Sequence, residues 1–269
     1  MDPRTIAQMP ENTSLSVEDV EGLVQVLIAA TDPTQQHTVV ERKRKLLEGI
    51  AQLVGADVFI WSASLPDTET HGDVMSSCLI EGGWASEEQR IQVYKALSNP
   101  QFAHVVQQPI VAAAQGMHYV TMHRRDIADD AWWLQFGEIW RRTGLDHFLM
   151  NIYPISLNSY SATAFHRQSG KPVFSERERM IVHLVFKHLE WYHQRALQDP
   201  SQGKLLQLAP RERQTLMLLL SGQTKREIAE NLGITEHTVG DYTKSIYKRF
   251  AVNSRGELQA VFQMGKSSA

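Results

Sequence analysis

The C-terminal part of the chain consists of four short apolar segments, each bounded by residues that start or stop a helix. The predicted helices cover 210–220, 225–232, 236–249 and 255–264. Their start signals are Pro210 at a first helical position, Thr235, and two capping boxes, Thr224 with Glu227 and Ser254 with Glu257. The glycines that follow helices are Gly222, Gly233 and Gly265. So complete a set of boundaries predicts a small domain of four short helices.

The spacing of three residues across the second turn is that of a helix-turn-helix. Ala229 is small enough for a second helix to approach, Gly233 permits the backbone to turn, and Val239 is placed to bury the inner face of the next helix. A generic helical bundle would use the same residues as core. The cations on the next helix favour the helix-turn-helix.

Charge is segregated along the chain. From Lys204 onward there are ten Lys and Arg against six Asp and Glu, a net charge of +4. Of the chain totals of 27 and 30, this leaves 17 against 24, a net charge of −7, for residues 1–203. An acidic body with a basic tail predicts that the tail meets a polyanion and that the body has another task.

The helix that follows the turn carries residues suited to a DNA backbone. The hydroxyl of Thr235 and the N–H groups at the positive helix end can hold a phosphate. Basic side chains occur on this helix and at the start of the preceding one, namely Lys244, Lys248, Arg249, Lys225 and Arg226. A protruding helix flanked by cations fits the major groove of duplex DNA. Scattered cations alone would indicate only a solvated surface. Because these cations lie beside a helix-turn-helix, the sequence predicts DNA binding.

The run LAPRERQTLMLLLSGQTKREIAENLGITEHTVGDYTKSIYKRFAVNSRGEL resembles the LuxR-type (GerE-type) helix-turn-helix domain of bacterial transcription regulators. Its most specific pieces are PRERQTL, KREIAENLGI, the Thr238-Val239 pair and NSRGEL. The resemblance implies a DNA-binding regulator, with Val239 partly in the core and partly able to meet a thymine methyl group. The expected DNA-contacting residues are Lys225, Thr235, Thr238, Val239, Tyr242, Lys244, Lys248 and Arg249.

Three positions depart from the family pattern. Gly240 stands where a basic residue is common, Tyr242 where His is common, and Ala209 where a capping Ser or Thr is usual. Gly240 inside a helix costs about 1 kcal/mol relative to alanine, and it has no side chain to read a base. The operator sequence is therefore not inherited from the family.

The preceding part of the chain alternates between helical and extended patterns. Predicted helices cover 17–28, 38–54, 87–98, 129–142 and 176–197, and predicted strands cover 57–63, 74–80, 116–125, 147–156 and 159–167. The last two strands read as a hairpin. This order predicts an α+β fold with an antiparallel sheet. Together with RRDIADDAWW and TAFHRQSGKPVFSERERMIVHLV, it resembles the GAF/PAS-like sensor domains found ahead of such tails.

These patterns divide the chain into four parts. They are a leader at 1–15, a sensor or dimerisation domain at 16–198, a linker at 199–204 and the DNA-binding domain at 205–269. The linker sequence DPSQGK has the proline, glycine and polar residues of a flexible connection. The body is not a phospho-receiver domain, because Asp129-Asp130 lies in mid-domain at a helix start and not after an early apolar strand.

Four aromatic residues of one predicted helix are candidates to line a ligand pocket, namely Trp132, Trp133, Phe136 and Trp140. They would form the wall of a pocket for a flat or acyl ligand, so the body is predicted to sense a small molecule. Aromatic residues at helical spacing are more often plain core. The alternative is therefore a ligand-free body that serves as a dimerisation or protein-interaction scaffold.

No sequence pattern indicates an enzyme, a metal site or a cofactor. The chain has no G-x-S-x-G, no glycine-rich loop before a helix and no H-E-x-x-H. Its eleven histidines include no pair three or four residues apart, and a single cysteine, Cys78, excludes a multi-cysteine metal site. No run approaches the roughly 20 apolar residues of a membrane span, and MDPRTIAQMPENTS lacks the order of a secretory signal. We therefore expect a non-enzymatic, cytoplasmic protein.

A homodimer is expected from the size of the DNA contact. One recognition helix contacts too few base pairs for useful selectivity, so such regulators present two helices to half-sites about one DNA turn apart. The predicted helix 176–197 carries apolar residues outside the stripe of Ile181, Leu184, Val185 and Leu189. The predicted dimerisation residues are Val182, Phe186 and Trp191.

Overall fold

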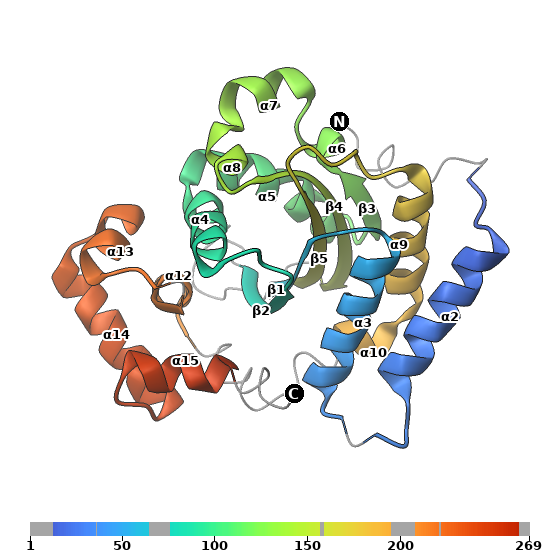
Figure 1. Ribbon diagram of the computed structural model, residues 1–269. Helices are drawn as coiled ribbons and strands as arrows, with labels where there is room; N and C mark the ends of the chain where they lie inside the picture. Colours follow the sequence, from blue (N-terminus) through green and yellow to red (C-terminus); the bar gives the residue numbers. More distant parts are fainter. Residues whose placement is uncertain are drawn as a thin grey trace.

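The computed structural model describes residues 13–35, 37–64, 76–156, 159–194, 208–220 and 222–263. The predicted linker 199–204, and residues 1–12 of the predicted leader, lie outside the described residues. A body of helices around one sheet is followed by a tail made of helices alone (Figure 1). The predicted α+β class with an all-α C-terminal domain is confirmed.

The body contains one five-stranded sheet in the order β2-β1-β5-β4-β3. Its strands are β1 (Val58–Ser64), β2 (Ser76–Gly82), β3 (Val120–His123), β4 (Leu145–Ser156) and β5 (Ser159–Gln168). Every neighbouring pair is antiparallel, and β4 with β5 forms the predicted hairpin. The turn residues 157–158 lie outside the described residues.

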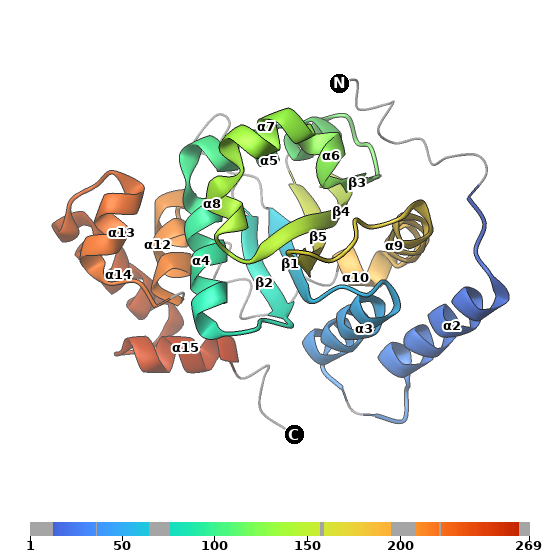
Figure 2. The ribbon, with the colours of Figure 1, turned by 45° about the horizontal axis from the view of Figure 1, so that its top comes forward.

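Helices cover both faces of this sheet (Figure 2). One face is covered by α4 (Glu87–Ser98), α5 (Pro100–Gln115), α7 (Asp130–Phe136) and α8 (Glu138–Arg141). The other is covered by α3 (Val39–Leu53), α9 (Glu176–His188) and α10 (Glu190–Gln194), with α2 (Val17–Thr31) packed against α3. The short α6 (Arg124–Ile127) follows β3.

Alternation along the strands divides the apolar residues between two cores. On β1, Val58 and Ile60 belong to the core beneath α4 and α5, whereas Phe59 and Trp61 belong to the core beneath α3 and α9. Successive side chains of a strand point to opposite faces, so a sheet covered on both sides needs apolar residues at almost every position. The strand sequences supply them.

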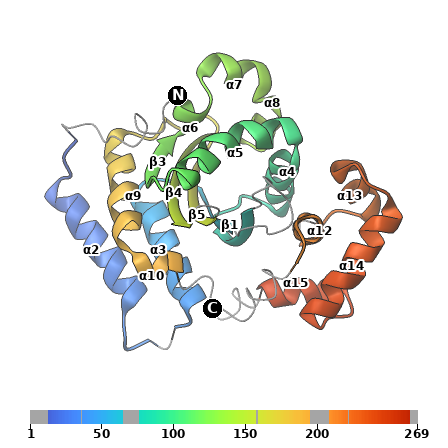
Figure 3. The same ribbon diagram turned by 180° about the vertical axis from the view of Figure 1, so that it is seen from behind.

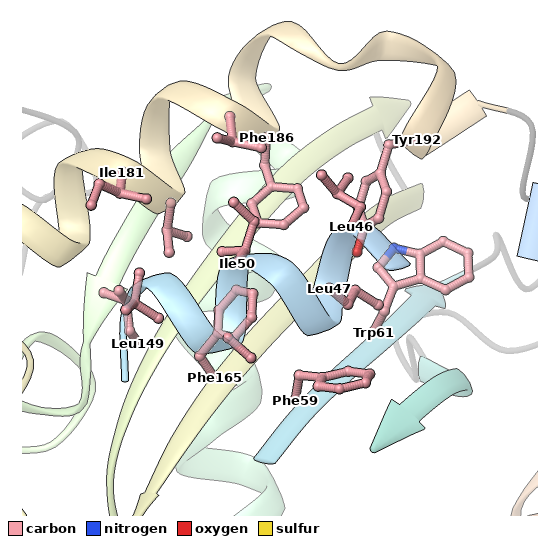
Figure 4. Packing of buried hydrophobic residues seen from close by; sticks show 14 of the residues in the cluster. Leu46, Leu47, Ile50, Phe59, Trp61, Leu149, Phe165, Ile181, Phe186 and Tyr192 are labelled. Carbon is pink, nitrogen blue, oxygen red and sulfur yellow. The ribbon is translucent and has the colours of Figure 1, made fainter. Parts of the chain in front are cut away.

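The residues predicted for dimerisation lie in or against the second core, where Figure 4 shows the Phe186 ring. Val182 and Phe186 are fully buried, and Trp191 is partly buried against the same cluster. The Phe186 and Tyr192 rings lie 4.8 Å apart, and Tyr192 in turn meets Trp61 edge-on at 5.7 Å. The premise that Val182 and Phe186 lie off the packed face was wrong, because the sheet and α3 together cover more of the helix than one stripe.

The predicted helix 176–197 is broken in the structure. Leu189 leaves the helical conformation (φ −95°, ψ 69°) and separates α9 from α10. His193 Nε2 donates a hydrogen bond to Phe186 O at 2.7 Å, which satisfies a carbonyl group at the end of α9. The break turns α10 back toward the sheet.

The sequence patterns missed α5 entirely. Asn99-Pro100 was interpreted only as the end of the preceding helix, yet the Asn99 side chain also accepts a hydrogen bond from Phe102 N at 3.1 Å and opens the next one. Pro109 lies inside α5, where proline usually breaks a helix. Packing of Phe102 and Ile110 into the first core outweighs that cost.

The four predicted tail helices are confirmed as α12 (Pro210–Leu220), α13 (Lys225–Leu232), α14 (Glu236–Phe250) and α15 (Arg255–Gln263). Seen from behind, α12 is the tail helix that lies beside α4 (Figure 3). Arg90 Nη1 of α4 donates to Leu220 O of α12 at 3.4 Å. The tail thus contacts the body through α12, and the exposed surface of α14 lies on a different side of the tail.

Candidate nucleic-acid interface

The start of each tail helix is fixed by local hydrogen bonds. Thr224 and Glu227 form the predicted capping box at α13, with Thr224 N donating to Glu227 Oε2 at 2.8 Å. At α12 only half of such a box forms, because Ala209 N donates to Glu212 Oε2 at 2.8 Å but alanine has no hydroxyl to accept in return. Hydrogen bonds between residues three positions apart thus define the starts of α12 and α13.

The turn between α13 and α14 has the predicted geometry. Gly233 adopts the left-handed conformation (φ 64°, ψ 36°) that favours glycine, and its N–H donates to Ala229 O. The N–H of Ile234 also donates to Ala229 O, at 3.1 Å. Ala229 is buried, as expected of the small residue where two helices approach.

The inner face of α14 is buried in the tail core. Val239, Ile246 and Phe250 are buried there against residues of the other three helices. Val239 is 0% exposed, so the predicted contact between its side chain and a thymine methyl group is contradicted. Its role is to hold α14 against α13.

The N-terminal end of α14 is exposed and capped by Thr235. The Thr235 hydroxyl oxygen accepts from Thr238 N at 3.1 Å and lies 2.9 Å from Thr238 Oγ1. The oxygen is therefore engaged by the helix, and one of the two hydroxyl protons of the Thr235–Thr238 pair remains to be donated to a phosphate. The N–H groups of the first turn and the positive end of the helix add to that attraction.

Three lysines of the predicted set are exposed, namely Lys225, Lys244 and Lys248. Lys225 Nζ lies 4.0 Å from the place that a β-carbon at Gly240 would occupy. An ammonium group from α13 therefore lies beside the gap that Gly240 leaves in α14. This arrangement supplies a cation where the glycine itself has none.

The remaining basic and aromatic candidates are less available. Tyr242 and Arg249 are half-buried. Arg226, at the start of α13, pairs with Glu230 at 3.0 Å on an exposed surface. An exposed pair of this kind contributes little to stability, but Glu230 competes with a phosphate for the Arg226 guanidinium.

The sequence interpretation missed two exposed residues of α14, His237 and Asp241. Their side chains are 87% and 54% exposed, and His237 Nδ1 lies 3.2 Å from Asp241 Oδ2. Asp241 Oδ1 also lies 3.4 Å from Lys244 Nζ. The helical spacing of these residues with Lys244 and Lys248 would have revealed one common face, but no acidic residue or histidine of α14 was considered as a DNA contact.

Comparison with known families identifies this part of the chain. Residues 206–262 match the family model described as GerE, bacterial regulatory proteins, luxR family. This segment is a LuxR-family helix-turn-helix domain. The match spans α12–α15 and the turn at Gly233. It covers less than half of the chain, so it identifies the domain and leaves the body unassigned.

Among solved structures, the chain is similar to two structures of SdiA. One is the crystal structure of Escherichia coli SdiA in space group P6522, with 19% sequence identity and a TM-score of 0.44, covering 91% of this chain and 97% of that one. The other is SdiA in complex with octanoyl-rac-glycerol, with 16% identity and a TM-score of 0.39, covering 95% and 98%. At TM-scores below 0.5 these likenesses say nothing of a shared ligand. No curated protein matches the chain.

The tryptophans predicted to line a ligand pocket lie in and beside the first core. Trp133 and Trp140 are buried, and Trp132 is half-buried. The Phe102 ring stacks on Trp140 at 5.2 Å, with 3° between the ring planes. The side chain of Phe136 lies outside the described residues. The predicted helix 129–142 is divided at Gly137 into α7 and α8, which places Trp133 and Trp140 on different helices.

A cleft of about 210 Å³ opens elsewhere on the body, at the junction of β3 and α6 with the start of α9. Its lining residues are His123, Arg124, Arg125, Asp126, His147, Phe148, Val173, Phe174 and Glu176. Burial lowers the pKa of His123, although Glu176 Oε1 lies 3.3 Å from its Nε2. None of the four aromatic residues predicted for ligand binding lines this cleft.

Within the described ranges, no group of three or more His, Cys, Asp or Glu side chains is arranged to hold a metal ion. In the same part of the chain, no helix has the length and apolar character needed to cross a membrane.

Proposed function

We propose that the protein is a non-enzymatic bacterial transcription regulator that binds duplex DNA through α14 of its LuxR-family domain. The observation that carries the proposal is the exposed face of α14, the helix after the turn, which bears Lys244 and Lys248 in a tail of net charge +4. A helix of this kind enters the major groove, which in B-DNA is wide enough to admit it.

Phosphate contacts would hold α14 in the groove. The N-terminal end at Thr235, Lys225 at the start of α13, and Lys248 near the far end of α14 are spread along the two helices of the turn. Such contacts fix the position of a protein on the duplex without reading its sequence. The bacterial cytoplasm, where chromosomal DNA lies, is the compartment that this function requires.

The salt dependence of DNA binding tests the proposal. The full chain is titrated against a pool of fluorescent duplexes of random sequence at several salt concentrations. Replacing Lys225 and Lys248 by Gln together should reduce the slope of log affinity against log salt by roughly two units. Lys187→Gln on α9 removes one exposed charge from the body and should leave the slope unchanged. Absence of binding by the wild-type chain at low salt refutes the proposal.

We propose that two copies bind DNA together, because one helix reads too few base pairs. The burial of Val182 and Phe186 removes the predicted contact surface and leaves the dimer geometry to be determined. Light scattering at micromolar concentration, with and without duplex, tests this point. A monomer under both conditions contradicts it.

A second candidate function, the sensing of a small molecule by a GAF/PAS-like body over the predicted range 16–198, is favoured by two polar atoms in the first core. Trp140 Nε1 and His166 Nδ1 are buried, and neither has a hydrogen-bond partner among the described residues. The two ring centres lie 5.3 Å apart. Burial lowers the pKa of His166 to about 3, so this imidazole is neutral near pH 7.

These atoms define the chemistry of a fitting ligand. An indole N–H donates, and Nδ1 of a neutral imidazole accepts when Nε2 carries the proton. A hydroxyl group within hydrogen-bond distance of both nitrogen atoms would satisfy them, and each atom costs about 1–3 kcal/mol while unpaired. The surrounding Phe102 and Phe148 rings favour an apolar remainder.

Native mass spectrometry of the purified full chain tests the sensing candidate. A bound small molecule is expected in the wild-type spectrum and should be lost in Trp140→Phe and His166→Phe. Trp133→Phe is the matched control, because Trp133 Nε1 already donates to Asp146 Oδ1 at 2.9 Å. A ligand-free wild-type protein, stabilised by Trp140→Phe, would instead favour the scaffold alternative.

A further inference from the structure

The outward face of α14 is a row of four side chains. His237, Asp241, Lys244 and Lys248 are spaced by four, three and four residues, which places them on one side of a helix with 3.6 residues per turn. All four are exposed. The opposite side is the buried face that contains Val239. A partner that binds the outward face of α14 therefore contacts these four side chains.

Asp241 is the unexpected member of the row. A carboxylate on a face that approaches a polyanion weakens binding by like-charge repulsion. The fold of the tail does not require it, since the side chain is 54% exposed and pairs with His237 and Lys244 on the same exposed face. Asp241 thus neither packs in the core nor attracts phosphate, which leaves contact with a base as its role when α14 meets DNA.

The major groove offers such a partner in the exocyclic amino group of cytosine. Cytosine presents N4–H₂ as a donor there, while guanine presents only the acceptors O6 and N7. Adenine also presents an amino group, but its N7 acceptor lies beside that group and repels a carboxylate. An isolated carboxylate therefore selects cytosine.

The neighbours of Asp241 suit this contact. Lys244 Nζ, 3.4 Å from Asp241 Oδ1, presents a donor beside the acceptor. A C·G pair shows a donor on cytosine beside the acceptors on guanine, which is the complementary pattern. Gly240 adds no side chain next to Asp241, and the nearest group to its open side is Lys225 Nζ at 4.0 Å.

We propose that Asp241 is a specificity-determining residue that accepts a hydrogen bond from the 4-amino group of cytosine, while Lys244 donates to the guanine of the same base pair. The inference rests on the proposed function, since it needs α14 in the major groove. Its effect is on sequence choice more than on affinity.

Selection of binding sites from a random duplex library by the full chain tests the proposal. Wild-type protein should enrich one C·G pair in each half-site by roughly tenfold over the other pairs. Asp241→Asn should shift that position toward A·T, because an Asn side chain pairs with N6 and N7 of adenine. Asp241→Ala should lose the preference and bind random duplexes more tightly.

The matched control is Glu236→Gln, which removes one negative charge from the same helix away from the row. It should also tighten binding to random duplexes but select the wild-type sequence. If Asp241→Asn and Asp241→Ala both select the wild-type sequence, the proposal for Asp241 is overturned while DNA binding stands. If the wild-type chain binds no duplex at low salt, both the proposed function and the proposal for Asp241 are overturned.

Discussion

The body and the tail hold themselves together by different means. Each tail helix carries its own boundary signals, such as the Thr224–Glu227 box and the left-handed Gly233. The body depends on contacts between distant segments, since β1 pairs with β5 across about a hundred residues, as in Trp61 with Thr163. Local signals therefore define the helix ends of the tail, whereas the sheet of the body forms only through pairing between distant segments.

The two regions also differ in where their polar groups lie. The body buries His166 and His193, and burial lowers the pKa of each to about 3. The one histidine among the described residues of the tail, His237, is 87% exposed. The buried histidines of the body are placed to contact a ligand inside the domain, whereas the exposed side chains of the tail are placed to contact an external partner.

The largest expected effect is a substitution that unfolds the tail and leaves the body folded. Val239→Asp places a charge in the tail core, at a cost of several kcal/mol, which is comparable with the stability of so small a domain. DNA binding and the helical signal of the tail should be lost. Tryptophan fluorescence should be unchanged, because all six tryptophans lie before residue 192.

His237→Asp is the control, since it adds a carboxylate at an exposed position of the same helix. It should leave the tail folded. A shift of the fluorescence transition in Val239→Asp would mean that body and tail unfold as one unit, and that the predicted boundary at 199–204 does not separate them.

A cavity in the second core should affect the body alone. Phe186 is fully buried among aromatic and aliphatic side chains, so Phe186→Ala should lower the free energy of unfolding by about 3–5 kcal/mol. Leu184→Ala, at a 39% exposed position of the same helix, should cost much less. Urea unfolding followed by tryptophan fluorescence measures both. Equal losses in the two variants would contradict the packing described for α9.

Mild acid should destabilise the body before the tail. Burial lowers the pKa of His183 to about 4, and those of His166 and His193 to about 3, from 6.5. The folded state therefore disfavours their protonated forms, so their contribution is fully present above pH 6.5 and is lost as the pH falls toward 4 and 3. The loss between pH 7 and pH 6 should be roughly 2 kcal/mol for the three together.

In the tail, the backbone N–H of Thr224 lowers the pKa of Glu227, so its capping box weakens only at a more acidic pH. Fluorescence midpoints of the body should fall between pH 7 and pH 6 while the circular dichroism signal of the tail holds. A body whose midpoint is constant over that range would show that these histidines are not buried in solution.

The tail was predictable from sequence nearly to the residue, because Thr224, Gly233 and Thr235 act within a few positions of themselves. The strands of the body were also predicted, because apolar runs such as DVFIWSA reflect burial on both faces. The failures came from tertiary packing. Pro109 concealed α5, and nothing local to Leu189 indicates that α9 ends there.

The candidate interface shows the same division. Lys225, Lys244 and Lys248 were found because a cation is informative by itself. The burial of Val239 and the exposure of Asp241 depend on which side of α14 faces the tail core, which the turn and the other three helices fix together. The helix proposed to contact DNA was predictable from the sequence, whereas the side of that helix that faces outward was not, because it depends on packing in the tail core.

The central claim is that the exposed row of α14 contacts DNA, and the salt dependence of a single variant tests it most directly. Lys248→Gln is compared with wild type and with Arg211→Gln, which removes an exposed cation from α12 in the same domain. Lys248→Gln should reduce the slope of log affinity against log salt by about one unit. Arg211→Gln should leave the slope unchanged. Identical slopes for wild type and Lys248→Gln would contradict the claim.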